Sequence, residues 1–194
     1  MLKFGTAILI IVLFFSCASK KRRTDNAGTD KPDSLALSKS DSLSPGNAAY
    51  YKMAGDSLII PSFTIEVALS QKANEKLTSN KETIIIAAWF SGQPKDTTTR
   101  EYAESGEMFI KSAQIELNNN RLANFEGIKF SKASYDSLAD KDIRVLINIF
   151  SGRRSATDNL LDCTILTEKM SAVKGQKFTL KGKLIGEIDS STSK

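Results

Sequence analysis

The chain has 194 residues and a formal net charge of +5, but residues 1–23 hold five basic residues and no acidic ones, so the remainder carries 22 of each sign. A neutral domain lacks the excess of Lys and Arg that follows phosphates, and we expect no nucleic-acid partner. The chain contains no histidine, which excludes Ser-His-Asp and Cys-His catalysis and histidine-ligated zinc or iron.

The chain begins with an apolar run, FGTAILIIVLFF over residues 4–15, which follows Lys3 and ends at Ser16. As a helix this run would rise about 18 Å, well short of the roughly 30 Å hydrocarbon layer of a membrane. A charged start, a short apolar run and a small final residue are the layout of a secretory signal peptide. We therefore expect residues 1–16 to be a cleaved signal peptide.

Cys17 directly follows the small residue, and this arrangement resembles the lipobox of bacterial lipoproteins, with Phe14 and Phe15 at positions where that family has Leu and then Ala or Ser. In that family the cysteine thiol receives a diacylglyceryl group, the signal is cut before it, and its amine is acylated. The resemblance implies that Cys17 is a lipidation site that carries palmitate and that the membrane is a partner through the N-terminal lipid. Ala18 is not the Asp that retains some lipoproteins at the inner membrane, so the resemblance implies an outer-membrane protein that faces the periplasm.

Four basic residues, KKRR at 20–23, leave an alternative open, because an uncleaved anchor with those flanks would keep its C-terminal side in the cytoplasm. Beside a lipid, each basic residue could add about 1 kcal/mol of attraction to an anionic leaflet, or the cluster could simply begin a solvated linker. The stretch that follows has few large apolar residues and cannot offset its ordering entropy. We expect residues 17–49 to be the lipidated cysteine and a flexible linker.

Residues 50–188 are expected to form one domain, followed by a disordered tail at 189–194. Its first clear strand, SFTIEVALS at 62–70, alternates apolar and polar residues, and two apolar runs follow at 83–91 and 143–151. Further strand candidates are MFIKSAQIEL, GIKF, LLDCTIL and KFTLKGKLIGE. Together they predict an all-β domain, an antiparallel β-sandwich of about seven strands with one or two short helical turns, similar to immunoglobulin-like or transthyretin-like sandwiches.

Two segments of the domain, 68–94 and 129–154, resemble each other. Each has a serine, a leucine seven residues later, a polar turn, an apolar strand and the triplet Phe-Ser-Gly; the offset is 61 residues at the serine and 60 at the triplet. We expect each serine to cap a short helical turn. Alignment on the triplets places Trp89 on the same face as Ile149, which predicts that Trp89 is a core residue rather than a sugar-stacking platform.

The same alignment predicts that the loops after both triplets lie at one end of the sandwich, where such folds often place recognition. The candidate partner-binding residues of these loops are Lys95, Arg100, Arg153 and Arg154. Arginine suits carboxylate or phosphate groups, although a solvated rim of mixed charge is the alternative. The acidic residues nearby lack the spacing of calcium ligands, so no metal is expected. Cys163 is expected to be a small buried hydrophobe, with an intermolecular disulfide as the alternative.

The sequence therefore favours a membrane-tethered, periplasmic binding or structural module that is not an enzyme and needs no cofactor. An envelope protein is a candidate partner. One alternative is a component of an envelope or secretion machine, because the layout resembles that of the transthyretin-like sandwich lipoprotein of type VI secretion. The other is a hydrolase that uses carboxylates or a Ser-Lys pair, although no such pair is singled out by its spacing.

Overall fold

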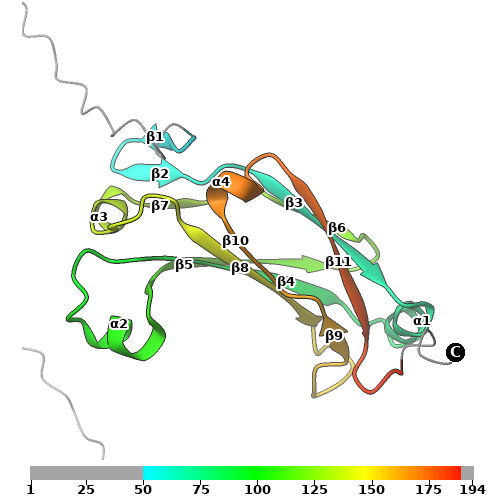
Figure 1. Ribbon diagram of the computed structural model, residues 1–194. Coiled ribbons are helices and arrows are strands. Elements are labelled where there is room, and N and C mark those ends of the chain that lie inside the picture. The colour runs from blue at the N-terminus through cyan, green and yellow to red at the C-terminus, as the bar shows by residue number, and fades with distance from the viewer. Residues whose placement is uncertain (1–49, 189–194) are drawn as a thin grey trace, which may run out of the picture. The chain divides into compact units, whose positions relative to one another are not determined.

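The computed structural model describes residues 50–188, so the expected signal peptide, Cys17, the linker and the tail lie outside the described residues. It confirms the β-sandwich class and contains eleven strands in three sheets with four short helices, more elements than the sequence predicted (Figure 1). In chain order the elements are β1 (Lys52–Ala54), β2 (Ser57–Ile59), β3 (Phe63–Leu69), α1 (Gln71–Ser79), β4 (Ile84–Gly92), α2 (Arg100–Ser105), β5 (Met108–Leu117), β6 (Leu122–Phe125), β7 (Lys129–Ser131), α3 (Lys132–Asp136), β8 (Arg144–Ser151), β9 (Leu161–Cys163), β10 (Leu166–Lys169), α4 (Met170–Val173) and β11 (Lys177–Leu184).

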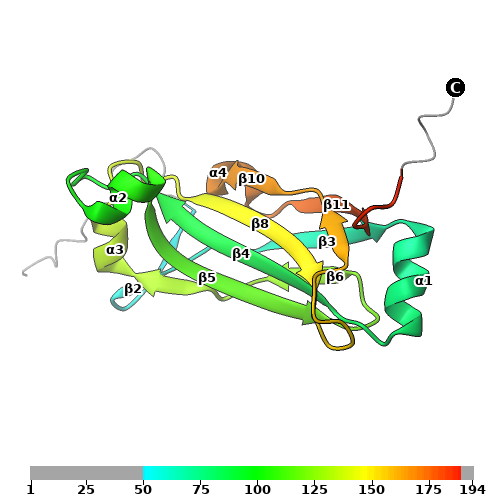
Figure 2. The same cartoon turned by 90° about the horizontal axis from the view of Figure 1, so that it is seen from below.

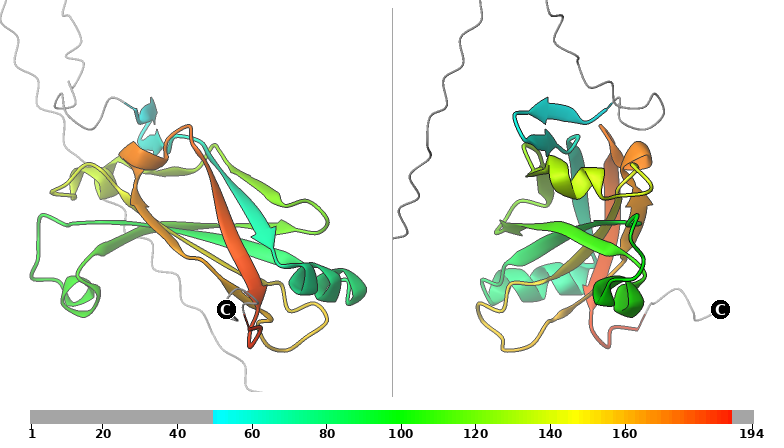
Figure 3. Two further views of the ribbon diagram at one scale, coloured as in Figure 1. Left: turned by 45° about the vertical axis from the view of Figure 1, so that its right-hand side comes forward. Right: turned by 90° about the vertical axis from the view of Figure 1, so that its left-hand side faces the viewer.

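Two four-stranded sheets form the sandwich. The front sheet has the order β10-β8-β4-β5, and the back sheet has the order β6-β3-β11-β9. A small third sheet, β1-β2-β7, lies at one end (Figure 1). All strand pairs of the two large sheets are antiparallel except one: β11 runs parallel to β3, with Lys177 opposite Thr64 (Figure 3). The sandwich is therefore predominantly, but not wholly, antiparallel.

The core lies between the two large sheets and follows the alternation of their strands. On β3 the inward residues are Phe63, Ile65 and Val67, as the sequence predicted, and all are buried. The Phe63 ring stacks on Phe125 of β6 with centroids 4.9 Å apart. On β4 the buried residues of the core cluster include Ile86 and Phe90. One contiguous apolar cluster thus joins the inner faces of both sheets.

The internal repeat is real at the level of structure. Ser70 Oγ accepts a hydrogen bond from the Ala73 N–H at the start of α1, and Ser131 Oγ does the same for Ser134 at the start of α3, which confirms both caps. Strands β4 and β8 are antiparallel neighbours in which Ala87 lies opposite Asn148. These two residues are 61 positions apart, the same offset as the two serines, so each is the equivalent of the other in the repeat. A pseudo-twofold axis perpendicular to the sheet therefore passes between them and relates the two segments.

The prediction that Trp89 is a core residue is wrong. It aligned the two segments on their triplets, at an offset of 60, whereas the strands keep the offset of 61 found at the serines. Ile86 and Ile147 are equivalent at that offset, and both are fully buried. The triplets, at offset 60, are out of phase: Phe90 is fully buried while Phe150 is half-buried on the opposite face. Because a shift of one residue reverses the face of every side chain in a strand, Trp89 points outward and is half-buried.

The prediction that both triplet loops lie at one end is also wrong, since antiparallel strands end at opposite ends of a sheet. Gly92 lies against Leu138 of the second repeat segment. The Gly152 N–H donates to the Thr83 carbonyl of the first at 2.8 Å, and a Cβ at Gly152 would collide with Thr83 Oγ1. Figure 2 shows α2 at one end of β4 and β8 and the β8–β9 connection at the other. The structure therefore separates Lys95 and Arg100, which precede or begin α2, from Arg153 and Arg154, which follow β8.

Candidate functional site

The two large sheets differ in what they present to solvent. The outer side of the back sheet is polar and internally paired. Thr64 Oγ1 donates to Asn124 Oδ1 at 2.9 Å, and Lys177 Nζ lies 3.0 Å from Glu66 Oε2. Such a face is well solvated and typical of a sheet that needs no partner.

The outer side of the front sheet is apolar at its centre. On β4 and β8, Trp89 lies directly opposite Leu146 and Ile85 lies opposite Phe150, so these side chains are nearest neighbours. Leu146 is 37% exposed, and Phe109, which follows the same face on β5, is 52% exposed. We call the surface formed by Ile85, Trp89, Phe109, Leu146 and Phe150 the Trp89 face.

Ala87 shows that these side chains are packed and not scattered. It lies at the centre of the Trp89 face and is 0% exposed, yet it takes no part in the core cluster. The outward side chains around it must therefore cover it. In Figure 2 no described helix or strand crosses β4, β8 and β5 on this side; α2 lies at one end and the β8–β9 connection at the other. The two apolar pairs flank Ala87 and half-buried Asn148, and uncovered apolar side chains grouped in this way are typical of an interaction site.

Three ion pairs border the Trp89 face, and in each the cation is more exposed than the carboxylate. Lys169 lies opposite Arg144 in the strand register, so both belong to the end near α2. The pairs, with the exposed fractions of cation and carboxylate side chains, are Arg144–Glu107 (49% and 22%), Lys169–Asp140 (53% and 38%) and Arg154–Glu116 (59% and 35%). The rim therefore carries paired charges at both ends, and the cation is the more exposed member of each pair.

Of the four loop residues predicted from the sequence, only Arg154 belongs to this surface. Its Nε and Nη2 donate to the two oxygens of Glu116 at 2.8 and 2.6 Å. These bonds, with one from Thr83 Oγ1, lower the pKa of the Glu116 carboxyl to about 2. Arg100 pairs with Glu104 on the surface of α2 at 2.6 Å. The remaining two, Lys95 and Arg153, are exposed.

Glu82, which the sequence did not single out, anchors the loop that carries Arg154. Its buried carboxylate accepts hydrogen bonds from the backbone N–H groups of Thr83, Arg154 and Ser155 at 2.8–3.1 Å and from Ser155 Oγ at 2.7 Å. Burial raises the pKa of Glu82, but these hydrogen bonds outweigh it and lower the pKa to about 2. Its partners Arg154 and Ser155 lie 72 and 73 residues along the chain, so no local pattern could have indicated the role.

Two other features of residues 50–188 bear on possible chemistry, a cavity and a free cysteine. A shallow cavity of about 600 Å³ on the back sheet is lined by Ser70, Cys163 and Lys181 among others. Cys163 packs half-buried against the core, and burial, followed by the charge of Asp162, raises the pKa of its thiol to about 11, which keeps it protonated at neutral pH. No group of three or more Cys, Asp or Glu side chains in this part of the chain could hold a metal ion.

Two further findings bear on function. None of the helices within residues 50–188 is long and apolar enough to span a membrane. Comparison of the chain with protein-family models, with curated proteins and with solved structures finds no match, so its function has to be inferred from its own residues.

Proposed function

We propose that this protein is a lipid-anchored, non-catalytic binding module of the bacterial cell envelope and that its partner docks on the Trp89 face. The observation that carries the proposal is the packed apolar surface on the outer side of the front sheet. Trp and Arg are enriched among the residues that dominate the free energy of protein interfaces, and this surface contains Trp89 and has Arg144 and Arg154 at its rim.

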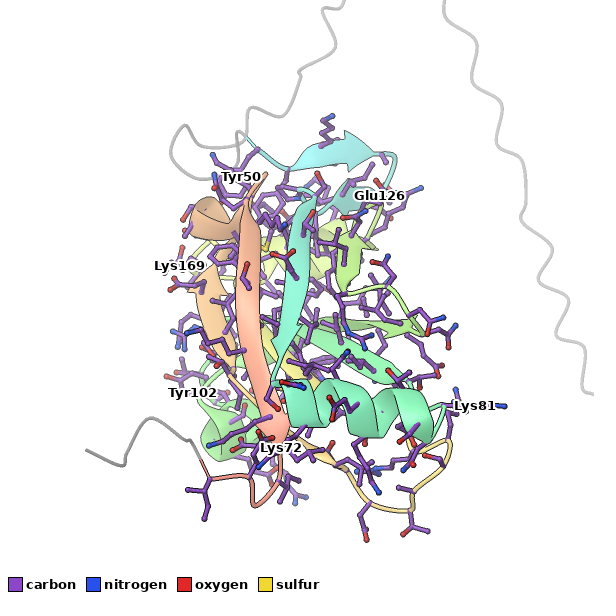
Figure 4. The ribbon with its side chains drawn as sticks, turned by 90° about the vertical axis from the view of Figure 1, so that its right-hand side faces the viewer. Tyr50, Lys72, Lys81, Tyr102, Glu126 and Lys169 are labelled. Carbon is purple, nitrogen blue, oxygen red and sulfur yellow. The ribbon has the colours of Figure 1, made fainter. Side chains whose placement is uncertain are left out.

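The anchor is the N-terminal lipid at Cys17, in the outer membrane on the periplasmic side. A flexible linker of this length has a root-mean-square span of roughly 30 Å, which lets the domain search for a partner. The described domain begins at Tyr50, whose hydroxyl donates to Asp142 Oδ1 at 2.5 Å. In Figure 4, Tyr50 lies at the top of the domain and Tyr102, on the helix beside the Trp89 face, lies in the lower half. The first described residue therefore lies away from Tyr102 and α2.

The substitution Cys17→Ala is expected to abolish incorporation of labelled palmitate, because it removes the thiol that would carry the lipid. The variant should also leave the outer-membrane fraction, and fractionation with labelling measures both effects. Equal labelling and equal fractionation of variant and wild type would contradict the anchor. Degradation of the wild type by protease added to intact cells would contradict the periplasmic orientation.

Docking on the Trp89 face is tested by photo-crosslinking in living cells. A photoreactive phenylalanine analogue at Leu146, which is 37% exposed, should form a discrete adduct, because the partner would cover that position. The matched control is the same analogue at Lys181, an exposed position on the back sheet. Adducts from Lys181 but none from Leu146 or Phe109 would place the partner elsewhere and refute this use of the surface.

A further inference from the structure

We infer that the partner of the Trp89 face is a protein segment, an acidic amphipathic helix of about four turns. This inference rests on the proposed function and names the chemistry of its ligand. Three properties of the described surface support it: its apolar centre, the dimensions of that centre, and the charge at its two ends.

The centre of the surface requires an apolar ligand. Trp89 packs beside Leu146, and about 13 Å along the strands Ile85 packs beside Phe150, so both pairs offer aliphatic and aromatic groups to apolar side chains. Two polar side chains of the same face are already engaged: Asn148 Oδ1 accepts the Ile149 N–H at 2.9 Å, and the Ser91 hydroxyl donates to Glu107 Oε2 at 2.5 Å.

The dimensions of the centre fit one face of a helix. Ile85 and Trp89 are four residues apart on one strand, or about 13 Å, and with Leu146 and Phe150 they span two strands. An amphipathic helix presents apolar residues at positions i, i+3, i+4 and i+7, a stripe about 10 Å long. Helices that dock on proteins in this way use such a stripe as their anchor.

The charged residues at the two ends of the surface determine the charge and the length that we expect for the helix. Arg144 and Ser151 mark the ends of β8, about 23 Å apart, and Arg154 lies just beyond the second end. A helix of about 15 residues covers that distance. Because the cations of all three rim pairs are more exposed than their carboxylates, Asp or Glu in the first and last turns of the helix would meet Arg154 at one end and Arg144 with Lys169 at the other.

The test uses the full-length lipidated protein in phosphatidylcholine vesicles and synthetic helical peptides of about 15 residues that lack Trp. One peptide carries a Leu stripe with Glu in its first and last turns; the second has Lys in place of Glu; the third has the Glu residues but a scrambled stripe. Trp89 is the only Trp of the chain, so its emission reports directly on the surface. We expect the acidic peptide to shift Trp89 emission and to bind at least about tenfold more tightly than the other two.

Variants identify the contacts. Leu146→Ser and the pair Arg144→Ala with Arg154→Ala should each weaken binding about tenfold, whereas Lys181→Ala on the back sheet should leave it unchanged. Raising the salt concentration from about 0.05 to about 0.5 M should weaken binding of the acidic peptide, because the rim charges are exposed. Unchanged thermal midpoints confirm that each variant is folded.

Three results would overturn the inference: equal binding of the Glu and Lys peptides, a shift of Trp89 emission with glycan oligosaccharides but not with peptide, or a shift with protein concentration alone, which would indicate a second copy of the chain. If the in-cell adduct forms at Leu146 but the acidic peptide does not bind, the proposed function stands and only this ligand class is wrong. If no adduct forms at Leu146 or Phe109, the proposed docking surface itself fails.

Discussion

Replacing Phe90 with alanine is expected to lower the free energy of unfolding by about 3 to 5 kcal/mol, whereas Trp89→Ala on the adjacent position should cost only about 1 kcal/mol. Phe90 is fully buried between the two sheets, so its loss leaves a cavity that the sandwich can close only in part. Trp89 lies half-buried on the outer face, and water can fill the space that its ring leaves. The difference therefore measures which face of β4 points into the core.

Denaturant unfolding followed by far-UV circular dichroism measures both variants, because Trp89→Ala removes the only Trp fluorophore. The slope with denaturant should stay the same in wild type and variants, so that midpoints report stability. Iodide should also quench Trp89 emission in the folded wild type. A loss of several kcal/mol in Trp89→Ala together with a small one in Phe90→Ala would reverse the assignment of faces and remove the Trp89 face as a binding site.

The substitution Glu82→Gln is expected to lower the free energy of unfolding at neutral pH by about 3 kcal/mol. The pKa of Glu82 is about 2 in the folded protein against its ordinary value of 4.5, and each pKa unit corresponds to about 1.4 kcal/mol. Glutamine keeps one acceptor oxygen but turns an amide toward the N–H and Oγ of Ser155, which leaves donors without acceptors.

The same group predicts how stability depends on pH. Because the folded pKa is depressed, Glu82 stabilises the fold above about pH 4.5, and this contribution is lost as the pH falls from there to about 2. Glu82→Gln should flatten the pH profile in that window. The control is Glu116→Gln. Glu116 also has a pKa of about 2, but it is exposed and paired with Arg154, so its substitution should change the pH profile less. A Glu82→Gln profile as steep as that of the wild type would show that other carboxyl groups cause the acid loss.

The Glu82 anchor has a local readout as well. It holds the backbone of Arg154 and Ser155, so its loss should free the loop that begins at Gly152. Trypsin, which cleaves after Arg, should then cut at Arg153 or Arg154 faster in Glu82→Gln than in Glu116→Gln under native conditions. Equal cleavage rates would mean that the carboxylate of Glu82 does not control this loop.

The sequence predicted those features that depend on local chemistry. The alternation of β3 and the serine caps at Ser70 and Ser131 are fixed by neighbouring residues, and the structure confirms them. The face of β4 could not be predicted, because Ile85, Ala87 and Trp89 are apolar on the outward side as well, so the run has no readable period. The outward apolar residues that form the Trp89 face are thus the reason why this face could not be predicted from the sequence.

Other features depend on partners that are far apart in the chain. The parallel pairing of β11 with β3 joins Lys177 to Thr64, and no local pattern marks two strands so distant as neighbours. The ion pair between Arg154 and Glu116 likewise joins residues 38 positions apart. For such contacts the topology has to be known before the side chains can be placed.

The position of β11 has a consequence for how the domain is made. This strand is the last of the described elements, yet it lies in the interior of the back sheet, between β3 and β9. Until residues 177–184 have left the ribosome, β3 and β9 have no common neighbour and the apolar sides of both sheets are exposed to water. Completion of the back sheet therefore waits until β11 has been synthesised and relies on contacts between distant segments, which are slow to form. A chain truncated before Lys177 would be left with two open strand edges, and such edges promote aggregation.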